Sequence, residues 1–129
     1  MKLSICVFVL SCLSLAGCNI GAVAFDCQPG ELCVCDGIGS CEITCLGGGC
    51  DFSCEGTGSC YFECPDGKCD ARARGQGHAE LSCPGGGCNF DCGGTGSCEL
   101  SSCDNACHVE CATVGSCENE CTAATCSLD

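Results

Sequence analysis

The chain of 129 residues has no tryptophan, one tyrosine, one methionine and only four lysine and arginine residues together. With aromatic residues at 5% of the chain, it cannot build a wide apolar core, because small domains already bury little of their surface. The few cations oppose 17 acidic residues and give a net charge of −13. This charge excludes nucleic acid as a partner and argues against direct adsorption to anionic lipid.

Arrangements of residues that support catalysis are missing as well. His78 lies in an expected turn and His108 on an outward position, and neither has a nucleophile or a metal-ligand spacing beside it. We expect both histidines to be solvated. Serine and threonine are scattered over the turns without a nucleophile elbow. The sequence therefore predicts a non-enzymatic protein without a cofactor.

Cysteine and glycine, in contrast, are abundant and regularly spaced. A five-residue phrase with cysteine at both ends, such as CDFSC from Cys50 to Cys54, is followed by a glycine-rich turn. Successive phrases begin nine and ten residues apart in alternation, so two phrases span 19 residues. Such a fixed period is the signature of a repeat architecture.

Within each phrase the apolar and polar residues alternate with the period of a β-strand. The cysteines and the central residue share one face, which we predict to be the inside. The central residues form a narrow apolar column: Ile43, Phe52, Phe62, Ala71, Leu81, Phe90, Leu100 and Val109. We therefore predict an all-β fold, a disulfide-braced β-solenoid with about 19 residues and two short strands per coil. An array of independent disulfide hairpins is the alternative.

The solenoid register also predicts what the outer faces carry. Glu42, Tyr61, Glu80, Glu99 and Glu118 would stack in one column, and Asp51, Asp70, Asn89 and His108 in another. Neighbouring carboxylates on adjacent strands repel by roughly 1 kcal/mol even in water. Glu80, Glu99 and Glu118 are therefore candidates for a divalent cation, whereas an acidic, solvated surface is the simpler interpretation.

The N-terminus reads as an export signal. Lys2 precedes an apolar run from Leu3 to Ala16, which is too short to span a bilayer and is typical of a signal peptide. The run ends in LAGC, Leu15 to Cys18, which resembles the lipobox of bacterial lipoproteins. The resemblance implies cleavage before Cys18, acylation of this cysteine and, because Asn19 is not aspartate, an outer-membrane location.

These boundaries divide the chain into a signal peptide at 1–17, a lipidated N-terminus and short tether at 18–26, and the cysteine-rich repeat domain at 27–129. Ordinary cleavage after Ala24 is the alternative, since Ala22 and Ala24 fit the small-x-small rule. It would release a soluble protein that begins at Phe25.

Both cleavages leave the same 20 cysteines between Cys27 and Cys126. With an export signal, this even number predicts disulfides formed in an oxidising compartment. Ala73 and Ala79 stand where the repeat calls for cysteine, and nested pairing across the longer turns makes them one missing bridge. The nested scheme predicts Cys35–Cys41, Cys50–Cys64, Cys54–Cys60, Cys69–Cys83, Cys88–Cys103, Cys92–Cys98, Cys107–Cys121 and Cys111–Cys117.

This scheme leaves the partners of Cys27, Cys33, Cys45 and Cys126 open. Cys126 has no register partner within the chain, so it is a candidate for an interchain disulfide.

The longer turn supports a second resemblance. GGTGSCELS, Gly93 to Ser101, is similar to the glycine-rich nonapeptide of the calcium-binding β-roll repeats of secreted bacterial toxins. At the position of the calcium-binding aspartate this chain has Cys60, Ala79 and Cys98. The resemblance therefore implies a similar coil held by disulfides instead of calcium.

The sequence thus predicts a surface-facing envelope lipoprotein that acts as a structural or binding module. Its lipid would engage the membrane, and its partner would be an extracellular protein or a glycan. Two alternatives stay open: a secreted toxin-like or defence module, and a cysteine-rich metal-binding protein.

Overall fold

The cysteine phrases fold into short strands that alternate between two parallel sheets. The computed structural model describes the backbone of residues 22–111, 117–119 and 127–128 and the side chains of residues 23–111. Sheet A contains β1 (Ala22–Cys27), β3 (Ser40–Cys45), β5 (Cys60–Glu63), β7 (Ala79–Cys83), β9 (Cys98–Cys103) and β11 (Cys117–Asn119). Sheet B contains β2 (Leu32–Cys35), β4 (Asp51–Cys54), β6 (Asp70–Ala73), β8 (Asn89–Cys92), β10 (His108–Cys111) and β12 (Ser127–Leu128).

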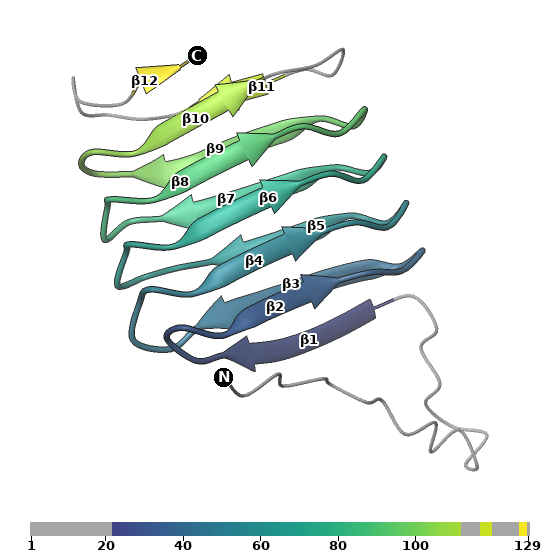
Figure 1. Ribbon diagram of the computed structural model, residues 1–129, viewed down its shortest axis with the longest axis horizontal. Coiled ribbons are helices and arrows are strands. Elements are labelled where there is room, and N and C mark those ends of the chain that lie inside the picture. The colour runs from purple at the N-terminus through teal and green to yellow at the C-terminus, as the bar shows by residue number, and fades with distance from the viewer. Residues whose placement is uncertain (1–21, 112–116, 120–126, 129) are drawn as a thin grey trace.

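The two sheets face each other, and the chain winds from one to the other through narrow turns (Figure 1). Each strand pairs in parallel with the strand two places along the chain, so Cys41 lies opposite Cys60 and Asp51 opposite Asp70. This register of 19 residues confirms the predicted solenoid. The hairpin array is wrong, because hairpins would pair consecutive strands antiparallel.

One departure from the 19-residue register is absorbed locally. The phrase from Cys98 to Cys103 has one residue more than the others, and β7 and β9 accommodate it by a register shift between Leu81 and Ser82. Such a bulge confines the irregularity to one strand pair. The register returns to 19 at the next coil, where Asn89 pairs with His108.

The first coil begins earlier than the sequence-based boundary. Residues 22–26, which we assigned to a tether, belong to β1, and β1 pairs over its whole length with β3 from Ala22–Ser40 to Cys27–Cys45. The prediction is wrong here because β1 lacks an opening cysteine. Its inward positions are Val23, Phe25 and Cys27, and Phe25 packs partly buried against the core.

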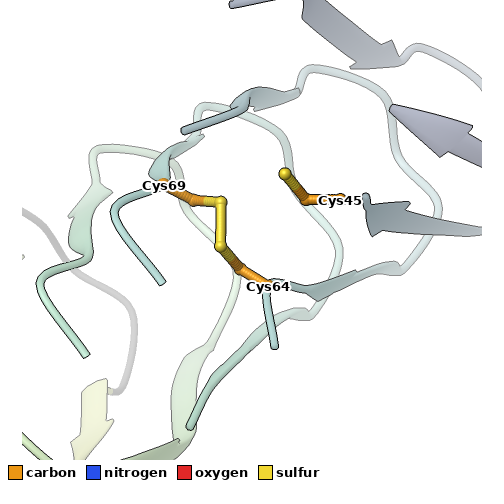
Figure 2. A group of neighbouring side chains, drawn as sticks. All are labelled: Cys45, Cys64 and Cys69. Carbon is orange, nitrogen blue, oxygen red and sulfur yellow. A yellow bond between two sulfur atoms is a disulfide. The ribbon is translucent and has the colours of Figure 1, made fainter. Parts of the chain in front are cut away.

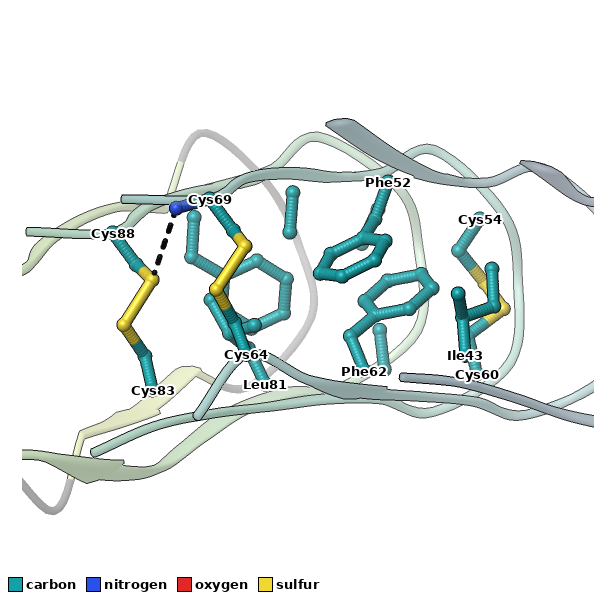
Figure 3. Close-up of a cluster of buried hydrophobic side chains, with 14 of the residues drawn as sticks. Ile43, Phe52, Cys54, Cys60, Phe62, Cys64, Cys69, Leu81, Cys83 and Cys88 are labelled. Carbon is teal, nitrogen blue, oxygen red and sulfur yellow. Dashed lines mark hydrogen bonds between the residues drawn. A yellow bond between two sulfur atoms is a disulfide. The ribbon is translucent and has the colours of Figure 1, made fainter. Parts of the chain in front are cut away.

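The core is one side chain wide between the sheets. Phe52 of β4 and Phe62 of β5 stack with ring centroids 4.8 Å apart, and Ile43 and Leu81 lie beside them (Figure 3). All four side chains are buried, as the predicted apolar column requires. Disulfides line both sides of this column, so sulfur supplies much of the buried material.

Each disulfide among the described side chains spans one turn and joins a cysteine at or next to the end of one strand to a cysteine at or next to the start of another. Cys45 pairs with Cys50 across a shorter turn and Cys54 with Cys60 across a longer one, with Cα atoms 5.9 and 6.1 Å apart. The pairs among the described side chains are Cys27–Cys33, Cys35–Cys41, Cys45–Cys50, Cys54–Cys60, Cys64–Cys69, Cys83–Cys88, Cys92–Cys98 and Cys103–Cys107. Cys111 is also disulfide-bonded.

This sequential pattern corrects the nested scheme. Cys35–Cys41, Cys54–Cys60 and Cys92–Cys98 are present as proposed. The outer pairs are wrong: Cys50–Cys64, Cys69–Cys83, Cys88–Cys103 and Cys107–Cys121. The nested scheme placed two bridges across each longer turn, whereas a solenoid strand has a turn at each end and each turn brings two cysteines together. Cys117, Cys121 and Cys126 lie outside the described side chains, and so do the pair Cys111–Cys117 and the interchain bond.

At the edge formed by the shorter turns the sulfurs of successive coils are close neighbours. The sulfur atoms of Cys45, Cys64 and Cys69 lie within 4.8 Å of one another, although only Cys64 and Cys69 are bonded among these three (Figure 2). A backbone contact also links coils here, because the amide of Cys69 donates to the sulfur of Cys88 at 3.4 Å (Figure 3). The disulfides therefore form a continuous column.

No helix in the described part of the chain has the length and apolar character needed to cross a membrane.

Candidate functional site

The outward surface of sheet A carries a column of acidic side chains. Glu42, Tyr61, Glu80 and Glu99 occupy consecutive register positions on β3, β5, β7 and β9. The column continues by register to Glu118 of β11, whose side chain lies outside the described residues. The predicted column is therefore confirmed. We call the outward side chains of Glu42, Tyr61, Glu63, Glu80 and Glu99 the acidic face.

An open hollow lies on the acidic face around Tyr61. It is lined by Glu42, Tyr61, Phe62, Glu63, Glu80 and Ser82. The Tyr61 side chain is 37% exposed, whereas its neighbour Phe62 is buried in the core. Such a hollow attracts cations in two ways. The carboxylates act by Coulomb forces, and the aromatic ring acts through its π face.

The two sheets differ in how their outward charges are balanced. The strands of sheet A contain no lysine or arginine in the described part of the chain. On sheet B, Arg72 stands in the outward column of β6, and Arg74 forms a salt bridge with Asp91. Asn89 further donates a hydrogen bond to Asp70 at 2.8 Å. Asp70 and Asp91 on sheet B thus have an amide and a cationic neighbour, whereas the described strands of sheet A offer their carboxylates no lysine or arginine.

One end of the acidic face includes a histidine that sequence reasoning set aside. His78 precedes β7, and its Nδ1 lies 2.8 Å from the hydroxyl of Ser97. Its Nε2 lies 3.8 Å from a carboxylate oxygen of Glu99. One ligand atom each from His78, Glu80 and Glu99 lie within 4.8 Å of one another.

The structure therefore changes the predicted cation candidates. Glu80 and Glu99 come together as expected, but their third partner is His78, whereas Glu118 is known only by its register position. His78 was taken as a solvated turn residue. The 19-residue register, applied to the turns as well as the strands, would have placed it beside Ser97 and Glu99.

Three other groups of cysteine and acidic side chains have ligand atoms close together in the described part of the chain. In each group the cysteines belong to disulfides, as with Cys45, Cys64 and Cys69. A disulfide sulfur is not a thiolate and does not replace one as a metal ligand. Of all four groups in the described part of the chain, only the one formed by His78, Glu80 and Glu99 contains no disulfide sulfur.

Comparison with protein-family models, curated proteins and solved structures finds no match for this chain. Cys18, the predicted lipidation site, lies outside the described residues.

Proposed function

We propose that this chain is a non-enzymatic lipoprotein of the bacterial outer membrane, anchored through Cys18, whose solenoid binds a partner through the acidic face. The partner would be a basic segment of an extracellular protein. The observation that carries the proposal is the unbalanced charge around Tyr61, where four carboxylates share one face without a lysine or arginine on the described strands of the same sheet.

The position of β1 supports cleavage before Cys18. Such cleavage leaves all six residues of β1 and places the lipid only a few residues ahead of Ala22. Cleavage after Ala24 would remove the pairs Ala22–Ser40, Val23–Cys41 and Ala24–Glu42 from the first strand pair. The lipobox site therefore agrees better with an intact first coil.

The geometry of the acidic face supports a partner that is basic and extended. Adjacent strands of a sheet are about 4.8 Å apart, so Glu80 and Glu99 follow each other at this short interval, and Tyr61 separates Glu80 from Glu42. A segment with several lysines or arginines could contact them in succession. Complementary charge of this kind raises the association rate and gives the interaction its salt dependence.

A charge-matched pair of variants tests the face. One variant neutralises the acidic face with E42Q, E63Q, E80Q and E99Q, and the other removes equal charge elsewhere with D51N, D66N, D104N and E110Q. Binding of a fluorescent oligolysine peptide is measured by anisotropy at several salt concentrations. We expect the first variant to lose more than about tenfold in affinity and the second less than about threefold.

Equal losses would show that net charge alone attracts the peptide, and this result would overturn the assignment to one face. If the unmodified protein does not bind the peptide, the proposal of a basic partner is overturned, and a glycan becomes the expected partner.

The anchor is tested by the intact mass of unreduced protein from membrane and soluble fractions. We expect an acylated chain that begins at Cys18 in the membrane fraction. A soluble chain that begins at Phe25 would overturn the anchor and favour a secreted toxin-like or defence module. If many cysteines could be alkylated, they would be free thiols, which contradicts the disulfides of the described cysteines. This result would favour the cysteine-rich metal-binding protein.

A further inference from the structure

We propose that His78, Glu80 and Glu99 form a binding site for a divalent first-row transition-metal ion of the zinc class. The ion would take one imidazole nitrogen and two carboxylates from the protein and complete its coordination with water. The proposal is independent of the basic partner, since it concerns the intrinsic metal affinity of these three side chains.

The backbone holds these side chains in one place. His78 and Glu80 are two residues apart along an extended segment, so both point outward, while Ala79 between them is fully buried. Glu99 is the cross-strand partner of Glu80. Hydrogen bonds from the Ala79 amide to Ser97 and from the Cys60 amide to the His78 carbonyl, 2.9 and 2.8 Å long, fix the segment to both neighbouring coils.

Ser97 orients the imidazole for this role. When Nδ1 donates its proton to the Ser97 hydroxyl at 2.8 Å, Nε2 carries the free lone pair and points toward Glu99. Metal-binding histidines in proteins are commonly oriented through such a hydrogen bond on the second ring nitrogen. The arrangement therefore prepares Nε2 as a ligand before any ion arrives.

The kinds of ligand atom select the class of ion. Calcium and magnesium prefer sites made of oxygen alone, whereas imidazole favours zinc, copper and nickel. Glu80 and Glu99 bring two negative charges that balance a divalent cation, and the ion would relieve their mutual repulsion. The three side chains are each partly exposed, so an ion can reach them from solvent.

The two histidines of the chain provide a matched test. Zinc chloride is titrated into the oxidised, untagged protein and followed by calorimetry and by the imidazole signals in NMR spectra. We expect one zinc ion per chain, with the His78 signals shifted and those of His108 unchanged. H78Q should weaken zinc binding by more than about tenfold, and H108Q should leave it within about twofold.

Several results would overturn the proposal. These are equal effects of H78Q and H108Q, an effect of neither variant, and displacement of zinc by an equal concentration of calcium. Each variant is first checked for the unreduced mass and the circular dichroism of the parent protein, so that loss of binding is separated from loss of folding.

Ser97 would act as a positioning residue. S97A should weaken zinc binding by about tenfold, in the range seen when a ligand loses its hydrogen-bonded support. S97T, which keeps a hydroxyl, should restore most of the affinity. Equal zinc affinity in S97A and S97T would overturn the role of Ser97. A variant that loses oligolysine binding but keeps zinc binding, or the reverse, would show that the metal site and the binding site for the proposed partner are distinct.

Discussion

Ala73 and Ala79 occupy the positions of a disulfide that one coil of the solenoid lacks. Ala73 lies in register between Cys54 and Cys92, and Ala79 between Cys60 and Cys98. The coils on either side carry the bridges Cys54–Cys60 and Cys92–Cys98. Both alanines are buried, so the missing sulfurs leave this turn held by packing and backbone hydrogen bonds.

The double variant A73C/A79C should therefore close a new disulfide. A bridge across this longer turn is expected to raise the free energy of unfolding by about 2 kcal/mol, because it restricts the unfolded chain. Intact mass under non-reducing conditions would show the bond, and guanidinium unfolding of the oxidised protein would show the gain. A79C alone is the control and should give no gain. A double variant with two free thiols would contradict the register.

Parallel pairing explains why so much of this fold follows from the sequence. A constant register of 19 carries the spacing of Glu42, Tyr61 and Glu80 directly into a spatial column, and the period of two decides which residues face outward. The apolar column was predictable for the same reason. Ala73 and Ala79 were likewise recognised as one absent bridge.

The disulfide partners across the shorter turns did not follow, because several sulfurs lie close together at this edge. The sulfur atoms of Cys45, Cys64 and Cys69 lie within 4.8 Å of one another, so register alone does not choose among them. The path of the backbone through each turn decides the pairing. His78 was missed for a different reason: it precedes β7, and the 19-residue register had been applied only to the strands.

The longer turns stack so closely that they require glycine. A Cβ atom on Gly75 would collide with the carbonyl oxygen of Gly56 in the preceding coil, whereas a Cβ atom on Gly37 meets nothing within 4 Å. Gly37 belongs to the first such turn, so no described turn of this kind precedes it. G75A should lower the free energy of unfolding by about 1 to 3 kcal/mol, as overpacked substitutions do.

G37A is the matched control for this change, since it alters the same turn position in another coil. Guanidinium unfolding should separate the two variants clearly. If G75A and G37A unfolded at the same denaturant concentration, close stacking of the longer turns would not be a source of stability.

Full reduction should unfold the described solenoid. Besides the cysteines, the core offers one central apolar side chain per strand, and in β6 this side chain is only Ala71. Each short disulfide contributes about 2 to 3 kcal/mol in the chain-entropy model, so the bridges together exceed the usual net stability of a domain. Circular dichroism and NMR dispersion should both collapse on reduction and alkylation, while alkylation alone changes neither. A reduced protein with native dispersion would show that packing suffices.

A disulfide map by glutamate-specific cleavage of the denatured, unreduced protein distinguishes the two pairing schemes. Cleavage after Glu63 and Glu80 yields residues 64–80, which contain Cys64 and Cys69 as their only cysteines. Under sequential pairing this fragment is released alone with one internal bond. Under nested pairing it stays linked to the fragments that carry Cys50 and Cys83.

The same digest extends the sequential rule to the C-terminal cysteines. Cleavage after Glu120 yields residues 121–129, which contain Cys121 and Cys126. If every strand end pairs with the next strand start, the rule gives Cys111–Cys117 and Cys121–Cys126, and all 20 exported cysteines are used within one chain. The fragment should then appear alone and lighter by two hydrogens than its reduced form. A fragment 121–129 linked to a second copy of itself would instead establish an interchain bond through Cys121 or Cys126 and give the solenoid a covalent dimer contact.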